Sequence, residues 1–212
     1  MIKNLIFDLD GTLYPISSGL ETECQQRVYD FFSLKLSVSK SDAQNISKQL
    51  LQKYHYEAQG VEKELGISQE EFLEYICAVS TDNLSPNYEL NKQLSQLPQR
   101  KIIYTDSTFS HVRDVLNKTE VDINLFADIY DAAKGNFQYK LNANAFINFC
   151  NYYKIIPSES IFFEDRQYNI SLAKSVGFKT VFIDEDEQNC KDADYNFKSI
   201  NQALIFLKDY LL

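Results

Sequence analysis

Acidic residues follow short apolar runs in this 212-residue sequence, in a pattern that could place several carboxylates in one site. Asp8 and Asp10 follow the apolar run that begins at Ile2, and Glu164 and Asp165 follow a second run. The other polar residues of this set are Thr105, Asp106 and Lys140. The sequence therefore offers a group of carboxylates, a hydroxyl and an ammonium for one site.

Crowded carboxylates repel one another, by about 4 kcal/mol for two charges roughly 4 Å apart at an effective dielectric constant near 20, unless a cation lies among them. Oxygen ligands of this hard type favour Mg²⁺ over Zn²⁺. One carboxylate can also act as a nucleophile through an aspartyl-phosphate, while a second one, two residues later, protonates the leaving group. Because a phosphate ester brings about two more negative charges, Lys140, Thr105 and backbone amides would have to assist Mg²⁺.

Alternating strands and helices must position these residues. Apolar runs predict strands at residues 2–9, 101–105, 127–132, 160–164 and 179–183, and a helical period predicts helices at 108–117, 142–153, 168–176 and 199–212. This alternation predicts a Rossmann-like parallel sheet with right-handed crossovers, an α/β fold. Ligands of such sheets bind beyond the carboxyl ends of the strands, which is where the polar set is expected.

The segment between the first two strands has a different character. Four apolar stripes with a helical period occur between residues 16 and 98, and Ser68 with Glu71 fits a capping box at the start of the third. We therefore expect an α/β core from residues 1–15 and 99–212, interrupted by an all-helical domain at 16–98.

Charge and composition narrow the class of protein. The net charge of −9 argues against a nucleic-acid polymer or an anionic membrane as the ligand. No apolar run approaches the ~20 residues of a membrane helix, and the 44% apolar fraction can form a core. The four cysteines have no C-x-x-C spacing and the N-terminus does not resemble a signal peptide, so a reducing cytoplasm is the expected location.

Four segments resemble motifs of the haloacid dehalogenase superfamily of phosphatases. Asp8-Leu9-Asp10-Gly11-Thr12 resembles its first motif, and the longer string FDLDGTLYPISSGL resembles the pyrimidine 5′-nucleotidase branch. The string Ile102-Ile103-Tyr104-Thr105 resembles the second motif, Lys140 in KLNANAF occupies the place of the third, and Phe163-Glu164-Asp165 resembles the fourth. The helices between the first two motifs are similar to a type 1 cap.

This resemblance implies a role for each residue. Asp8 would be the nucleophile and a Mg²⁺ ligand, and Asp10 would be the general acid and base, with its backbone carbonyl on the metal. Thr105 and Lys140 would hold the phosphoryl group, and Lys140 would also restrain Asp8. Asp165 would complete the metal site, with Glu164 acting through water.

Several residues near these motifs have competing interpretations. Lys134 lies in the same predicted loop as Lys140, although the spacing to the following helix favours Lys140. Asp106 should weaken phosphate binding unless it points away or binds a substrate hydroxyl. Tyr14 is a candidate for lining the substrate cleft, and His111 is expected in helix packing or capping. We interpret the acidic run at residues 184–187 as a solvated loop.

The leading hypothesis is a Mg²⁺-dependent phosphatase of small phosphate monoesters, with the pyrimidine nucleotides UMP and CMP as first substrates. A sugar-phosphate or phosphoglycolate phosphatase, or a phosphomutase, is an alternative on the same fold. Carbon–halogen hydrolysis is a further alternative on the same fold. Asp10 argues against it, because dehalogenases of the superfamily need no acid at that position. A non-catalytic binding protein that keeps the fold is an alternative of a different class.

Overall fold

The computed structural model describes residues 1–211, and these residues divide into two compact units. The first unit comprises Met1–Ser18 and Leu84–Leu212, and the second comprises Gly19–Asn83. The expected C-terminal helix also included residue 212, which lies outside the described residues. Within the described part of the chain, no helix has the length and apolar character required to cross a bilayer.

The first unit contains a parallel sheet with the strand order β3-β2-β1-β4-β5-β6. The strands are β1 (Asn4–Phe7), β2 (Arg100–Tyr104), β3 (Asp128–Tyr130), β4 (Ser160–Glu164), β5 (Lys179–Ile183) and β6 (Tyr195–Phe197). The α/β class and the first five strands confirm the prediction. The chain leaves β1 toward β2 and β3 and later returns to β4 on its other side, so the strand order reverses at β1. Ligand sites of doubly wound sheets lie at such a reversal.

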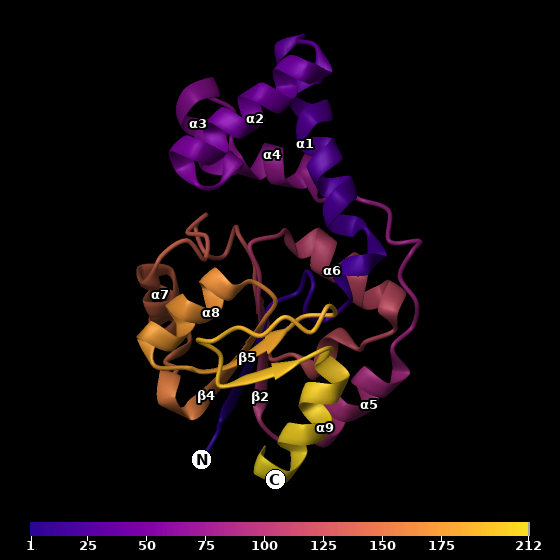
Figure 1. Ribbon diagram of the computed structural model, residues 1–212, viewed down its shortest axis with the longest axis vertical. Coiled ribbons are helices and arrows are strands. Elements are labelled where there is room, and N and C mark those ends of the chain that lie inside the picture. Colours follow the sequence, from indigo (N-terminus) through magenta and orange to yellow (C-terminus); the bar gives the residue numbers. More distant parts are fainter. Residues whose placement is uncertain (212) are drawn as a thin grey trace. The chain divides into compact units, whose positions relative to one another are not determined.

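Helices of the first unit cover both faces of the sheet (Figure 1). They are α5 (Tyr88–Gln96), α6 (Phe109–Thr119), α7 (Ala143–Tyr153), α8 (Gln167–Val176) and α9 (Ile200–Leu211). On the face covered by α7 and α8, the buried Tyr104 stacks on Phe149 with the ring centroids 4.5 Å apart. Phe7 and Phe163 stack at 4.7 Å as register partners on β1 and β4. Aromatic packing on β1, β2 and β4 therefore stabilises the three strands that end at the predicted site.

The second unit is a bundle of short helices. It contains α1 (Leu20–Leu36), α2 (Lys40–Tyr54), α3 (Glu57–Leu65) and α4 (Gln69–Ile76). Phe31, Phe32 and Phe72 form its aromatic core, with ring centroids 5.1–5.9 Å apart. The predicted cap at Ser68 is confirmed, because its hydroxyl accepts the backbone N–H of Glu71 at 3.1 Å.

The division between the units differs from the expected insertion at residues 16–98. Helix α5, expected among the inserted helices, belongs to the sheet unit. The backbone N–H of Asn87, the N-cap of α5, donates to the carbonyl of Thr119 at 2.7 Å, and the Asn87 amide contacts Asn201 of α9 at 3.0 Å. Leu90 and Leu94 of α5 are fully buried. The helical insertion is therefore shorter than expected and includes α3, which the apolar stripes did not indicate.

Candidate active site

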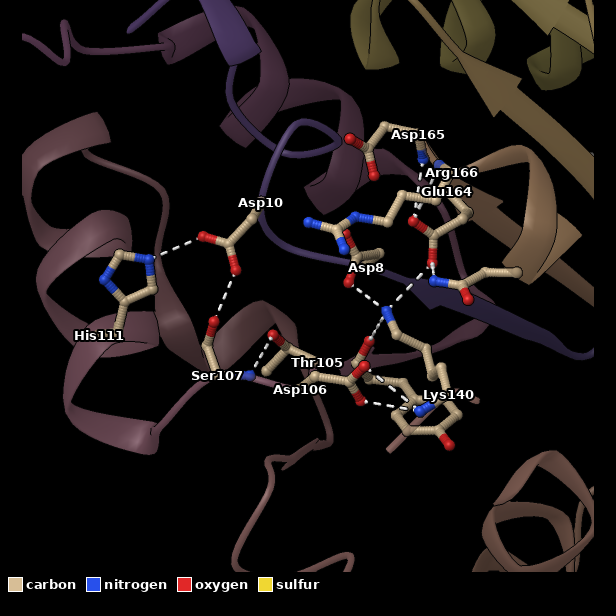
Figure 2. A network of polar contacts seen from close by, with 12 residues as sticks. Asp8, Asp10, Thr105, Asp106, Ser107, His111, Lys140, Glu164, Asp165 and Arg166 are labelled. Carbon is tan, nitrogen blue, oxygen red and sulfur yellow. Dashed lines mark hydrogen bonds and ion pairs between the residues drawn. The ribbon is translucent and has the colours of Figure 1, made fainter. Parts of the chain in front are cut away.

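The carboxyl ends of β1, β2 and β4 bring the predicted residues together (Figure 2). Asp8 follows β1, and its backbone N–H donates to the carbonyl of Phe163 at 2.9 Å, which continues the ladder one step past the strand. Thr105 follows β2 and donates in the same way to the carbonyl of Tyr130 at 3.0 Å. Glu164 is the last residue of β4. The parallel register therefore fixes the backbones of these residues along one edge.

Lys140 is the cation that links the strand ends. Its buried Nζ contacts Asp8 Oδ1 in a short ion pair, Glu164 Oε2 at 3.0 Å and the carbonyl oxygen of Tyr104 at 3.3 Å. The competing Lys134 instead pairs with Asp128 Oδ1 at 2.5 Å, near the other end of the same loop. The structure therefore places Lys140, and not Lys134, in the site.

Burial and neighbouring charges shift the pKa values of Lys140, Asp8 and Glu164. Burial alone would lower the pKa of Lys140, but the charges of Asp8, Glu164 and Asp106 raise that pKa well above its ordinary value. Burial and the charge of Glu164 raise the pKa of Asp8, although Lys140 opposes them. The pKa of Glu164 is lowered, because Lys140 and the hydrogen bonds it accepts outweigh its burial. One ammonium thus does not compensate all the negative charge of this edge.

Asp165 adds a third carboxylate to Asp8 and Glu164. Carboxylate oxygens of the three lie within 4.8 Å of one another. Burial and the charge of Glu164 raise the pKa of Asp165. Its Oδ1 atom is buried and has no hydrogen-bond partner among the described residues. An uncompensated buried carboxylate oxygen in an all-oxygen donor set fits a hard divalent cation such as Mg²⁺.

Gly11 makes room for Asp165. Its φ is +77°, and a Cβ added there would lie 2.3 Å from Asp165 Oδ2 and 2.7 Å from its Cγ. A side chain at this position would therefore meet both an unfavourable backbone conformation and the carboxylate of Asp165. This geometry gives a physical reason for glycine after Asp10.

Asp10 lies at the same edge but points away from Asp8 (Figure 2). Its Oδ1 accepts hydrogen bonds from Tyr14 Oη at 2.5 Å and from His111 Nε2 at 2.7 Å. Its Oδ2 accepts from Ser107 Oγ at 2.7 Å. Burial would raise the pKa of Asp10, but the charge of His111 and the three hydrogen bonds lower it below the ordinary range. Three hydrogen bonds therefore hold the side chain of Asp10 in this orientation.

The sequence did not indicate the partners of Asp10. Tyr14, expected in the wall of the substrate cleft, donates its hydroxyl to Asp10. His111 has its expected place in a helix, since its backbone N–H is capped by Thr108, but its ring also belongs to the site. Neither His111 nor Ser107 was predicted there. The available signal was topological, because a helix that follows a parallel strand begins at the edge where that strand ends.

Thr105 and Asp106 also have defined partners. The Thr105 hydroxyl oxygen accepts the backbone N–H of Ser107 at 3.0 Å, whereas the N-cap of α6 is Thr108. Both carboxylate oxygens of Asp106 accept the backbone N–H of Lys140, at 3.1 and 3.2 Å. Asp106 therefore anchors the loop that carries Lys140.

Arg166 also lies at this edge, although the sequence analysis did not single it out. Arg166 is the N-cap of α8, and its side chain extends over the same edge (Figure 2). Burial raises the pKa of Asp165, and the positive charge of Arg166 opposes that rise.

The acidic run at 184–187 makes its contacts outside the site. Glu185 accepts hydrogen bonds from the backbone N–H and hydroxyl of Ser17 at 2.8 and 2.9 Å, and Glu187 pairs with Lys198.

Known proteins resemble this chain in sequence and in fold. A sequence model of the haloacid dehalogenase-like hydrolases matches residues 2–177. The chain is 25% identical to phosphate metabolism protein 8 of Saccharomyces cerevisiae, over 98% of this chain and 66% of that protein, so it spans just under two thirds of that relative. A HAD phosphatase from Thermococcus onnurineus has a TM-score of 0.66 at 22% identity, covering 97% of this chain and 98% of its own. The L-2-haloacid dehalogenase from Xanthobacter autotrophicus with covalently bound chloropropionic acid has a TM-score of 0.62 at 12% identity, covering 98% and 99%.

Proposed function

Because the chain belongs to the haloacid dehalogenase-like hydrolase family, we propose that it is a Mg²⁺-dependent phosphatase of small phosphate monoesters. The observation that carries the proposal is the arrangement of three carboxylates and one lysine at the end of β1, in which Asp165 Oδ1 has no partner among the described residues. A divalent cation beside Asp8 and an anionic phosphoryl group beside Lys140 would complete the charge balance of this edge.

The side chains divide the reaction between them. An oxygen of Asp8 would form a bond to phosphorus while the ester P–O bond breaks, and Asp10 would give a proton to the departing oxygen. Water would then attack phosphorus, Asp10 would take up its proton, and the bond between Asp8 and phosphorus would break to release inorganic phosphate. Lys140 and the hydroxyl of Thr105 would hold the phosphoryl oxygens.

Asp8, Asp165 and the backbone carbonyl of Asp10 would hold Mg²⁺. The ion would reduce the repulsion between the phosphate and the carboxylates. Glu164 suits an indirect role, because both of its oxygens already accept hydrogen bonds, from Lys140 and Asn169 on one side and from the backbone of Asp165 and Arg166 on the other.

Phosphate-ester hydrolysis is favoured over dehalogenation by the environment of Asp10. Three donors hold this carboxylate at the edge where a general acid and base is needed, whereas a dehalogenase of the superfamily needs none there. The similarity to a relative named for phosphate metabolism agrees with this choice. The resemblance of residues 7–20 to the pyrimidine 5′-nucleotidase branch supports UMP and CMP as the first substrates to test.

The helical unit Gly19–Asn83 is proposed as the cap that the resemblance implies. It leaves the sheet unit shortly after Asp10 and rejoins it before β2, the place of a type 1 cap in the chain. A cap excludes water and completes a site when it closes. Crystal structures with and without a phosphate analogue test this role, and one unchanged position of the unit in both would contradict it.

Phosphate release from p-nitrophenyl phosphate tests the proposed function. We expect turnover with Mg²⁺, none with EDTA, and none from Asp8→Asn, whereas the exposed Asp114→Asn keeps the parent rate. A panel of UMP, CMP, AMP, phosphoglycolate and sugar phosphates then tests the substrate, and a flat or sugar-preferring profile would refute the nucleotidase assignment. Chloride release from 2-chloropropionate without phosphate release would refute the phosphatase itself.

A further inference from the structure

Protein oxygens surround the ammonium group of Lys140 in the described part of the chain. They are Asp8 Oδ1, Glu164 Oε2 at 3.0 Å and the carbonyl oxygen of Tyr104 at 3.3 Å. An ammonium group has three N–H donors, and these oxygens can take all of them. A phosphoryl oxygen that binds to Lys140 must therefore displace one of its protein partners.

The charge at this edge also calls for a further cation. Asp8, Glu164, Asp165 and Asp106 place carboxyl groups around the site, while Lys140 supplies one ammonium. A phosphate monoester brings up to about two more negative charges. A cation that acts in addition to Lys140 and Mg²⁺ would stabilise the bound phosphoryl group.

Arg166 approaches the site from the end of β4. Its exposed side chain begins at the N-cap of α8, directly after Asp165, and Figure 2 shows the guanidinium group directed toward Asp8 at the end of β1. The backbone of Arg166 is held on both sides. Its N–H donates to Glu164 Oε1 at 3.1 Å, and its carbonyl oxygen accepts the N–H of Ile170 at 3.1 Å. The base of this long side chain is therefore fixed at the edge of the sheet.

The charge of Arg166 acts on both sides of Asp8. Burial raises the pKa values of Asp106 and Asp165, and the positive charge of Arg166 is among the effects that oppose both rises. Asp106 lies just beyond β2 and Asp165 just beyond β4, and β1 with Asp8 lies between these two strands. The field of the guanidinium group therefore spans the place where a phosphoryl group would bind.

We propose that Arg166 is a substrate-binding residue that donates hydrogen bonds to the phosphoryl oxygens of the ester and of the phosphate product. Its planar guanidinium group has five N–H donors, and two of them can bind two oxygens of one phosphoryl group. These oxygens stay on phosphorus and stay negatively charged from substrate to product, so Arg166 should stabilise the ground state and the transition state alike. The inference rests on the proposed phosphatase function.

Arg166→Gln tests this role in the full chain with Mg²⁺ present. We expect the KM for p-nitrophenyl phosphate and the Kd for inorganic phosphate, measured by isothermal titration, to rise together by about 10- to 100-fold, as for a lost hydrogen bond between charged groups. The kcat should stay within about threefold of the parent, because an interaction made equally in both states changes KM alone. Phosphoglycolate should show the same rise in KM.

Arg100→Gln is the matched control. It makes the same change of charge at an exposed arginine, but Arg100 begins β2, whereas the site lies at the carboxyl ends of the strands. There the guanidinium group lies 5.0 Å from the ring centroid of Tyr153 and donates to the carbonyl oxygen of Tyr153 at 3.2 Å. We expect the parent KM and Kd for this variant.

Titration with Mg²⁺ alone separates phosphate binding from a disturbance of the neighbouring Asp165. Arg166→Gln removes a nearby cation and no proposed metal ligand, so its Mg²⁺ affinity should equal or exceed that of the parent. A lower Mg²⁺ affinity would overturn the inference, because the variant would then act through Asp165.

Three other results would also overturn it: a parent-like KM and Kd in Arg166→Gln, a fall in kcat at unchanged KM, or a loss confined to phosphoglycolate. The last would place Arg166 on the carboxylate of the substrate rather than on its phosphoryl group. A parent chain that neither hydrolyses p-nitrophenyl phosphate nor binds inorganic phosphate would overturn the proposed function itself, and this case is distinguished because the parent then fails along with the variant.

Discussion

Replacing Gly11 by alanine should impair metal binding through Asp165. The backbone at Gly11 has φ +77°, and a left-handed conformation costs an alanine roughly 1–2 kcal/mol. In addition, the new Cβ would lie 2.3 Å from Asp165 Oδ2, so the carboxylate must turn away from its place beside Asp8. Disturbing even the outer partners of a metal ligand typically lowers metal affinity by about 10- to 100-fold, and here a proposed ligand itself is moved. We therefore expect at least about a tenfold loss of Mg²⁺ affinity, or about 1.4 kcal/mol.

Gly66→Ala separates the steric effect from the backbone effect. Gly66 has φ +66° and no heavy atom within 4 Å of an added Cβ, so it incurs the strain without the contact. Isothermal titration with Mg²⁺ should give the parent affinity for Gly66→Ala and the reduced affinity for Gly11→Ala, and urea unfolding in EDTA should show that both are folded. Equal Mg²⁺ affinity in the two variants would refute the role given to Asp165 and the reason given for Gly11.

Three further predictions concern stability, measured by urea unfolding. Lys140→Met should lower the free energy of unfolding by about 3–5 kcal/mol, because it leaves the buried Asp8 without its cation; a loss below about 1 kcal/mol would contradict the buried pair. Tyr104→Phe should be as stable as the parent or more stable by up to about 2 kcal/mol, because the buried Tyr104 hydroxyl has no partner among the described residues; a clear loss would show that this hydroxyl is bound. Asp194→Asn should destabilise the chain above about pH 5 and progressively less toward about pH 3. Burial would raise the pKa of Asp194, but Lys174 and the backbone and hydroxyl hydrogen bonds from Thr180 lower it in the folded state. The contribution of Asp194 is therefore present above the unfolded pKa and is lost as the pH falls; a loss independent of pH would contradict this.

The convergence of acids at one edge could be predicted because it depends on periodicity and topology. Apolar runs of strand length located β1, β2 and β4, and parallel strands place their carboxyl ends together whatever the side-chain rotamers are. Asp8, Thr105 and Glu164 are therefore fixed by the backbone. The same reasoning brings the Lys140 loop near the edge, and the spacing to the following helix favoured Lys140 over Lys134. The ion pairs agree with that choice, because Lys134 pairs with Asp128 and Lys140 pairs with Asp8.

The hydrogen-bond partners of Asp10 could not be predicted, because they depend on which side chains meet. A single histidine in a helix has many possible partners, and nothing in the spacing of Tyr14, Ser107 and His111 connects them to one carboxylate. The position of α5 was missed for a similar reason. Its apolar stripe shows that one face of the helix is buried, but it does not show whether that face packs against the sheet unit or against the inserted helices. The three-residue strand β6 and the nine-residue helix α3 are too short to give a clear period.

The identity of the residue that carries the phosphoryl group tests the account most directly. The chain is mixed with a phosphate ester and Mg²⁺, quenched in acid within one turnover, digested, and analysed by mass spectrometry. We predict one phosphoryl group on the peptide that contains Asp8, removable by hydroxylamine as an acyl phosphate is, and none in Asp8→Asn. Phosphate release without this adduct, or with the adduct on another residue, would contradict the assignment of Asp8 as the nucleophile.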